Sequence, residues 1–271
     1  GLLTCCHDPR FEAIRGDCRG HETLERCLRD VNWIIPLAAI VGAPACEEHK
    51  YDVWSTNYSA LDLLLTLRDP ETQRIIFPTT TSGYGTGGDV SEDSEMKPIS
   101  SYGFSKVEAE KAILEGMESI SLRLATVFGV SPRMRLDLLV NDFVHRAVTD
   151  GSVVLYQPHT RRNCVHVRDV ARCFVHCMKH FDEMKGKPYN VALPEGNLTK
   201  WGLCERIKEH VPSFWFCEAA TGEDPDRRDC WPSTKRLEAT GFQCEDDFDV
   251  IGTLFVFYFF FLFLRRRGGI I

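Results

Sequence analysis

The stretch Arg74-Ile-Ile-Phe-Pro-Thr-Thr-Thr-Ser-Gly-Tyr-Gly85 decides the fold of this 271-residue chain. It opens with a short apolar run, which is typical of a buried strand, and it continues into a turn rich in hydroxyl groups. The pattern then predicts a helix from about Ser101 to Leu114 and a second buried strand over residues 120–125. Strand, helix and strand at this spacing favour a parallel α/β sheet.

The same alternation continues on both sides of this stretch. Upstream, the pattern predicts strands over 11–14 and 31–37 and helices over 22–29 and 51–67. After about Arg133 the spacing loosens, and the predicted elements are helices over 136–149, 169–180 and 200–211 and short strands over 153–155, 164–167 and 189–191. We therefore expect a parallel α/β unit followed by a smaller α/β lobe.

Composition narrows the class of protein. Apolar residues make up 44% and charged residues 26%, which is ordinary globular usage and excludes a collagen-like or multi-span membrane chain. The net charge of −7 argues against a nucleic-acid partner. The 12 cysteines include no Cys-x-x-Cys pair. We interpret them as mostly buried thiols in a reducing compartment, which predicts a cytoplasmic protein.

The end of the chain, residues 249–271, has a different composition. Residues 250–264 are 15 apolar or near-apolar residues, and Arg265, Arg266 and Arg267 follow them. A helix that spans a bilayer needs about 20 such residues, with about 17 as the lower limit. A C-terminal membrane anchor over 250–264 and a tail that arises from a gene-model error are the two alternatives. Membrane contact is expected only under the first.

Tyr102 and Lys106 form a Tyr-x-x-x-Lys pair near the start of the predicted helix. Residues four apart share a helix face, and an ammonium about 4–6 Å from a phenol lowers the pKa of that phenol. Because a tyrosine ordinarily titrates at about 10, this help suits it to act as a base near neutrality. A hydroxyl of the preceding turn can hydrogen-bond both Tyr102 and a substrate oxygen, at the strand ends where ligands bind. Two solvated side chains are the alternative interpretation.

These motifs resemble the extended short-chain dehydrogenase/reductases of the nucleotide-sugar epimerase/dehydratase family, over roughly residues 10–245. The matching segments are Gly16–Asp17, Pro36–Ala39, Thr80–Tyr84, Tyr102–Lys106, Arg123–Gly129 and Arg162–Val167. Three further runs, Ile35–Pro44, Ser131–Asn141 and Gly222–Asp229, are similar to the GDP-heptose 4-dehydrogenase group. The resemblance implies a Rossmann-like, doubly wound parallel sheet for NAD in residues 1–130. It implies a nucleotide-sugar-binding lobe, interleaved with the sheet, in residues 131–248.

The resemblance also implies roles for individual residues. The implied catalytic residues are Thr80, which orients the sugar hydroxyl, Tyr102, which acts as the base, and Lys106, which binds the nicotinamide ribose. The implied cofactor is NAD, with NADP left open, and its implied contacts are Asp17, Cys18, Leu37, Ala38, Ala39, Asn57, Tyr102, Lys106 and Val127. The implied substrate is a nucleotide-diphosphate sugar, with contacts from Thr80, Tyr84, Thr126, Asn141, Arg162, Arg228 and Asp229. For Asn141, Arg228 and Asp229 an ordinary polar or solvated position is the alternative.

The implied reaction is oxidation or epimerisation at a sugar carbon, which we place at C4. Thr81 and Ser82 stand where the family's dehydratases carry an Asp-Glu pair, and hydroxyls do not replace the acid and base that elimination needs. Family members dimerise through the helix that carries Tyr102 and Lys106, so a homodimer is expected. His176 and His180 have metal-ligand spacing, but no acidic partner is evident, and we expect no metal site.

One feature of the family has no match in this sequence. It is the Gly-x-x-Gly-x-x-Gly turn after the first strand, whose backbone approaches the cofactor's pyrophosphate. We therefore expect the first β-α unit of the fold to be missing and the chain as given to bind NAD poorly. The alternative function is an inactive, truncated family member that binds a nucleotide sugar or a partner subunit without turnover.

Overall fold

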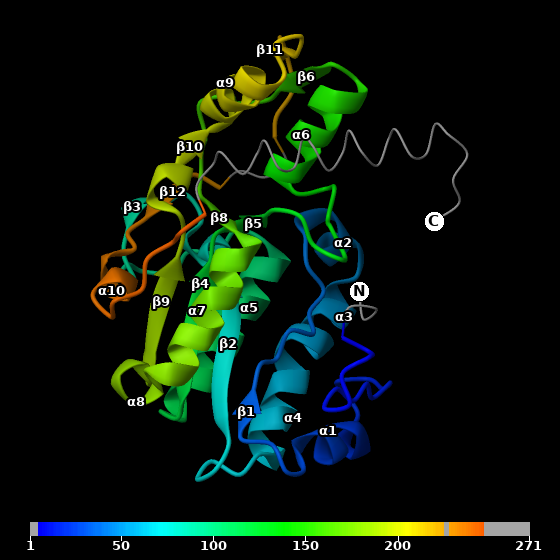
Figure 1. Ribbon diagram of the computed structural model, residues 1–271, viewed down its shortest axis with the longest axis vertical. Coiled ribbons are helices and arrows are strands. Elements are labelled where there is room, and N and C mark those ends of the chain that lie inside the picture. Colours follow the sequence, from blue (N-terminus) through cyan, green and yellow to red (C-terminus); the bar gives the residue numbers. More distant parts are fainter. Residues whose placement is uncertain (1–4, 225–227, 247–271) are drawn as a thin grey trace.

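The computed structural model describes residues 5–224 and 228–246. Its centre is a parallel four-stranded sheet in the order β1 (Trp33–Ile34), β2 (Arg74–Thr80), β4 (Ser119–Leu124) and β9 (Lys187–Val191) (Figure 1). Thr80, Leu124 and Val191 lie in register. The carboxyl ends of three strands therefore form one edge of the sheet.

Helices cover both faces of this sheet (Figure 1). Alternate residues of β2 point to opposite faces. Ile75 and Phe77 pack in one cluster with α1 (His21–Leu28), α4 (Ala60–Leu67) and α5 (Ser101–Glu115). Ile76 packs in another with α7 (Val167–Lys179) and α8 (Phe181–Met184). The three side chains are at most 2% exposed, which explains the unbroken apolar run of this strand and confirms the doubly wound α/β fold.

A smaller α/β lobe lies beyond the carboxyl edge of the sheet (Figure 1). Its core is formed where the parallel strands β6 (Ser152–Leu155) and β11 (Trp215–Glu218) meet α6 (Leu139–Thr149) and α9 (Lys200–His210). Thr199 caps α9, because its hydroxyl accepts a hydrogen bond from the backbone N–H of Gly202.

Short elements complete the part of the fold that is described. Three two-stranded pairs are β5 (Thr126–Phe128) with β8 (Cys164–His166), β3 (Gly88–Val90) with β12 (Cys230–Pro232), and β7 (Arg161–Arg162) with β10 (Leu198–Thr199). The remaining short helices are α2 (Ala43–Glu48), η2 (Thr81–Tyr84), η3 (Pro194–Gly196) and α10 (Lys235–Glu238).

The first 70 residues depart most from the predicted elements. Residues 11–14 form no strand, and Phe11 is 38% exposed. The strand predicted over 31–37 is reduced to β1. The helix predicted over 51–67 is divided into α3 (Lys50–Trp54), a π-helical turn η1 (Ser55–Ser59) and α4. The wider turn brings Asn57, 3% exposed, into the interior, and π turns of this kind are frequent at functional sites.

Two further predictions concern a membrane anchor at the end of the chain and a metal site. The aromatic run at 250–264, predicted as an anchor or a gene-model error, lies outside the described residues. Within residues 5–224 and 228–246, no helix has both the length and the apolar character to cross a bilayer. The same residues contain no cluster of three or more His, Cys, Asp or Glu side chains placed to bind a metal ion.

Candidate active site

Thr80 and Tyr102 meet at the carboxyl edge of the sheet. Thr80 is the last residue of β2, and Tyr102 lies in the first turn of α5. The helix begins there because the Ser100 hydroxyl accepts a hydrogen bond from the backbone N–H of Gly103. Thr80 lies close enough to Tyr102 to lower the pKa of its phenol. The structure therefore brings the predicted hydroxyl and phenol near each other.

A line of hydroxyl groups continues from this pair to the substrate lobe. The Thr80 hydroxyl donates to Ser82 Oγ at 2.9 Å and accepts from the backbone N–H of Ser82 at 3.1 Å. Ser82 Oγ also accepts from Arg228 Nη1 at 2.6 Å. Arg228 thus reaches the candidate catalytic pair through Ser82.

Burial raises the pKa of Tyr102, and this differs from the sequence prediction. The Arg228 cation is the largest opposing influence on this pKa, and the Thr80 side chain comes second. Lys106 is not among the leading influences on this pKa. The phenol pKa is therefore raised where the sequence predicts that it is lowered, because the dominant effect is desolvation.

Lys106 is buried one helical turn after Tyr102. Its side chain is 4% exposed, and its Nζ lies 3.9 Å from the centre of the Phe77 ring. The structure gives this amine no hydrogen-bond acceptor among the described residues. Burial lowers the pKa of Lys106 to about 7, and the Glu110 carboxylate acts in the opposite direction. A buried amine that lies over a ring face and has no hydrogen-bond acceptor is suited to bind a ligand hydroxyl.

Asn57 anchors the loop that follows β1. Its side-chain oxygen accepts from the backbone N–H of Ile40 at 2.8 Å, and its Nδ2 donates to Ile40 O at 3.0 Å and to Ser105 Oγ at 3.1 Å. Cys18, Ala38, Asn57 and Phe77 line one open pocket under this loop. The structure thus brings together Cys18, Ala38 and Asn57 from the predicted cofactor contacts.

Four other predicted cofactor contacts, Asp17, Leu37, Ala39 and Val127, do not line this pocket. Asp17 is exposed and pairs with Arg19, which holds the Asp17 pKa down at about 2. Leu37 is 69% exposed, whereas Ala39 is half-buried. Val127 is half-buried in the middle of β5, whose first residue is the predicted substrate contact Thr126.

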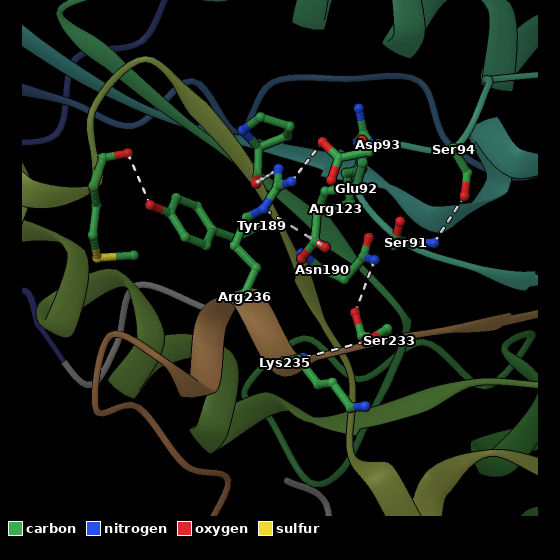
Figure 2. Close-up of polar contacts among 12 residues, drawn as sticks. Ser91, Glu92, Asp93, Ser94, Arg123, Tyr189, Asn190, Ser233, Lys235 and Arg236 are labelled. Carbon is green, nitrogen blue, oxygen red and sulfur yellow. Dashed lines mark hydrogen bonds and ion pairs between the residues drawn. The ribbon is translucent and has the colours of Figure 1, made fainter.

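Tyr84 does not join the site. It is 1% exposed, and its hydroxyl donates to Asn190 Oδ1 and accepts from Arg123 Nη1, both at 2.7 Å. Arg123 also donates to the backbone oxygen of Glu92, whose carboxylate accepts from the backbone N–H of Asn190 (Figure 2). Tyr84 belongs to this buried network, so its assignment as a substrate contact is corrected.

Asn141 also has a structural role. Its Oδ1 accepts from the backbone N–H of Gly129 at 3.3 Å, and its Nδ2 donates to Arg135 O at 2.9 Å. Both ends of its amide therefore hold the loop between β5 and α6. This structural role matches the ordinary polar alternative and leaves the side chain without a direct route to a sugar.

Arg162 and Asp229 lie beside the segment that carries Arg228. Arg162 is 5% exposed, donates to Arg228 O, and forms an ion pair with Asp224 at 3.4 Å. Asp229 pairs with Arg161 at 3.1 Å. The predicted phosphate-binding arginine therefore faces a carboxylate of its own chain.

Sequence reasoning missed three residues that the structure places around the site. Glu110 lies one helical turn after Lys106 in α5. Because Tyr102, Lys106 and Glu110 are each four residues apart, the sequence spacing already places Glu110 on the same helix face. Lys200 and Asp224 approach Arg162 from two other segments. No local pattern signals these two, because their proximity depends on the pairing of β7 with β10.

The comparisons with known proteins agree with this architecture. Residues 4–192 match the NAD dependent epimerase/dehydratase family. An uncharacterized UDP-glucose epimerase of Bacillus subtilis (strain 168), YtcB, is 29% identical over 178 residues, which are 62% of this chain and 54% of that relative. The chain therefore spans about half the length of this curated relative.

Solved structures show the same fold at low sequence identity. The UDP-glucuronic acid 4-epimerase of Bacillus cereus, in complex with UDP-glucuronic acid and NAD, superposes with a TM-score of 0.84 at 19% identity, over 96% of this chain and 85% of that one. The dTDP-glucose 4,6-dehydratase DesIV of Streptomyces venezuelae, with NAD and TYD bound, gives 0.82 at 22% identity, over 95% and 82%. The chain belongs to the NAD dependent epimerase/dehydratase family.

Proposed function

We propose that this protein oxidises a sugar carbon, C4, of a nucleotide-diphosphate sugar with NAD, and that return of the hydride to the opposite face completes an epimerisation. The observation that carries the proposal is the placement of Thr80, at the end of β2, beside Tyr102, in the first turn of α5, at the carboxyl edge of the sheet. Family membership and the substrates and cofactor of the matching structures support it.

In the proposed reaction, Tyr102 as phenolate accepts the proton of the sugar hydroxyl, and Thr80 orients that hydroxyl. NAD accepts the hydride from the same carbon. Thr81 and Ser82 supply no acid–base pair for elimination, so the proposal excludes 4,6-dehydration. Arg228, which acts on Tyr102 through space and on Thr80 through Ser82, stabilises the negative phenolate.

The residues present fit part of an NAD molecule. The buried amine of Lys106 has no acceptor among the described residues, and a ribose hydroxyl would supply one. The pocket lined by Cys18, Ala38 and Asn57 lies beside Phe77, the ring under Lys106. Asp17, at the edge of this pocket, is the proposed contact to the adenosine. The homodimer expected through α5 and the cytoplasmic location stay proposals.

The test is conversion of GDP- and UDP-sugars into their C4 epimers, measured by chromatography of the sugar nucleotides, with transient NADH absorbance reporting the oxidation half-reaction. Tyr102→Phe removes the base and is expected to lower the rate by about 10²-fold or more, with an unchanged thermal unfolding temperature. Tyr51→Phe, at a side chain that is 85% exposed, is the matched control and should leave the rate unchanged. Equal rates for Tyr102→Phe and the parent protein would reject the proposal.

The alternative function makes a different prediction in the same experiment. An inactive family member would bind a nucleotide sugar without forming NADH, and Tyr102→Phe would change nothing measurable. Calorimetric titration with the same nucleotide sugars separates binding from turnover.

A further inference from the structure

Segment 240–246 runs along α7 in the direction opposite to that of the helix. At its start, the Thr240 hydroxyl lies 2.9 Å from Nε2 of His176, which belongs to the last turn of α7. At its end, the backbone N–H groups of its last two residues donate to the Asp169 carboxylate, in the first turn, at 2.9 and 3.2 Å. Two side chains of α7 therefore hold the segment in place.

His166 lies where this segment, the start of α7 and the end of β5 meet. Its side chain is 2% exposed, and its Nδ1 is 3.4 Å from Oδ2 of Asp246, in the segment. The same Nδ1 is 3.4 Å from the backbone nitrogen of Arg168, whose N–H it accepts as the cap of α7. On the other side of the ring lies Gly129, where a Cβ would stand 2.3 Å from Nε2.

Gly129 begins the loop that leads from β5 into the substrate lobe. Its φ is +117°, and the approach of the His166 ring leaves no space for a side chain. Its N–H donates to Asn141 Oδ1 at 3.3 Å, and Asn141 Nδ2 donates to Arg135 O at 2.9 Å. Arg135 is one of the cations that lower the pKa of Tyr102. A displacement of the His166 ring therefore reaches a loop that acts on the candidate base.

The two partners of His166 Nδ1 require opposite states of this atom. The Arg168 N–H needs a lone pair on the nitrogen, whereas the Asp246 carboxylate needs a hydrogen there. The neutral ring can carry its single hydrogen on either nitrogen, but the protonated ring must carry one on Nδ1. Protonation therefore ends the hydrogen bond that caps α7 and makes the ring a donor to Asp246.

The charges near the ring support this exchange of partners. Charged side chains face the ring or its carboxylate partner from segment 240–246 and from α7: Asp246, Arg168, Asp169 and Arg172. From β5 the ring meets Gly129 and, edge to face at 5.4 Å, the ring of Phe128, and neither residue titrates. Burial lowers the pKa of His166, and the Asp246 carboxylate is the largest opposing influence.

Asp246 keeps its charge while His166 gains a proton. Burial of Asp246 acts to raise the pKa of this carboxyl, but Arg172 and His166 together hold that pKa below its usual range. A carboxylate is therefore present to receive the hydrogen that protonation places on Nδ1.

We propose that His166 is a proton-operated switch between segment 240–246 and the loop that begins at Gly129. With a bare Nδ1 the ring caps α7; after protonation it binds Asp246 instead, and its displacement moves the backbone of Gly129. Because this loop carries Arg135, the switch acts on the environment of Tyr102. In that last step alone the inference rests on the proposed function, since the contacts of His166 with Asp246 and Gly129 do not depend on it.

The test is NMR of the protein labelled at histidine and glycine, titrated between about pH 4.5 and 8. The ring resonances of His166 should give a pKa below 6.5, and the amide resonance of Gly129 should shift with the same midpoint. Asp246→Asn removes the opposite charge and should lower that midpoint by about one pH unit. His166→Gln should abolish the titration of the Gly129 amide.

His180→Gln is the matched control. His180 follows α7 directly, its ring stacks on that of His176, and its side chain is 40% exposed. It pairs with Glu183 and has no contact with Asp246 or Gly129 among the described residues. The Gly129 midpoint in this variant should equal that of the parent protein.

Each outcome decides the inference. A Gly129 amide that does not titrate, or that titrates with a midpoint different from that of His166, would overturn it. Should His166→Gln fail to fold, an unchanged midpoint in Asp246→Asn would equally overturn it. Turnover against pH should show an inflection at the His166 midpoint, and its absence would reject the step from the loop to Tyr102. The NMR arm needs no turnover, so failure of the proposed reaction would leave its result intact.

Discussion

Arg123 binds Glu110 with a distance of 2.6 Å between Nη2 and Oε1, and neither side chain is more than 6% exposed. Arg123 Nε donates to the same carboxylate at 3.0 Å, so the contact is a fork. The pair joins β4 to α5, the helix that carries Tyr102 and Lys106. Ser121 also donates to Glu110, at 2.7 Å. The position of the candidate catalytic helix therefore depends on a buried ion pair.

Glu110→Ala is expected to destabilise the protein strongly. The substitution leaves the Arg123 cation buried without its carboxylate, which costs about 3–5 kcal/mol in comparable pairs. The measurement is the free energy of unfolding in urea. Glu108→Ala is the control on the same helix, because Glu108 pairs with Lys111 at an exposed position, where such a pair contributes about 0–1 kcal/mol. Similar losses for both variants would contradict the role given to Arg123 and Glu110.

Asn57→Ala is expected to loosen the loop after β1. The substitution leaves the backbone N–H and C=O of Ile40 without their side-chain partner, which costs about 1–3 kcal/mol where the groups stay buried. Amide hydrogen exchange of residues 37–41 should accelerate. Ser105→Ala is the control, because it removes only the third hydrogen bond of Asn57 and keeps both bonds to Ile40. Equal acceleration in both variants would show that Asn57 does not anchor the loop.

The parallel α/β sheet and the helix that carries Tyr102 were predictable from the sequence, and the reason is local. Residues 75–77 are an apolar run whose alternate side chains pack against helices on both faces, so the pattern itself indicates burial. The proximity of Thr80 to Tyr102 follows from the end of β2 and from the start of α5 at the Ser100 cap. The division of the helix at Asn57 was not predictable, because Ser55–Ser59 carries no glycine or proline that would mark an irregular turn.

The misplacement of Tyr84 has a different physical cause. Its position after a hydroxyl-rich turn suggested an exposed residue, but Arg123 and Asn190 draw its hydroxyl into the interior. Both partners come from strands far away in the sequence, so no local pattern records them. The ion pairs of Asp224 were hidden for the same reason, since they depend on how the lobe closes on itself.

Arg228→Gln is expected to raise the pKa of Tyr102. Removing the cation leaves the phenolate with less electrostatic support, while burial continues to favour the neutral phenol. If Tyr102 acts as the base, the rising limb of turnover against pH should move to higher pH. Arg161→Gln, in which the lost guanidinium had paired with Asp89 and Asp229, should leave that limb in place. If the limb does not move in Arg228→Gln, then Arg228 does not stabilise the phenolate of Tyr102 during turnover.

Lys106→Met is expected to stabilise the protein at neutral and acidic pH. Burial lowers the Lys106 pKa from 10.5 to about 7. Below pH 7 the folded protein must keep this amine charged in a desolvated environment, and the resulting loss of stability is on the order of 5 kcal/mol. Between pH 7 and 10.5 the unfolded chain binds more protons at this position, so the stability of the parent protein rises with pH.

The difference between Lys106→Met and the parent protein should therefore shrink as the pH rises. It should be largest below pH 7 and vanish as the pH approaches 10.5, when the amine is neutral in both states. Unfolding in urea at several pH values measures it. Lys111→Met, at an exposed position of the same helix, should show no such trend. A constant difference across this range would mean that methionine packs better than lysine for reasons other than charge. It would contradict the conclusion that Lys106 is a buried amine whose charge is poorly compensated.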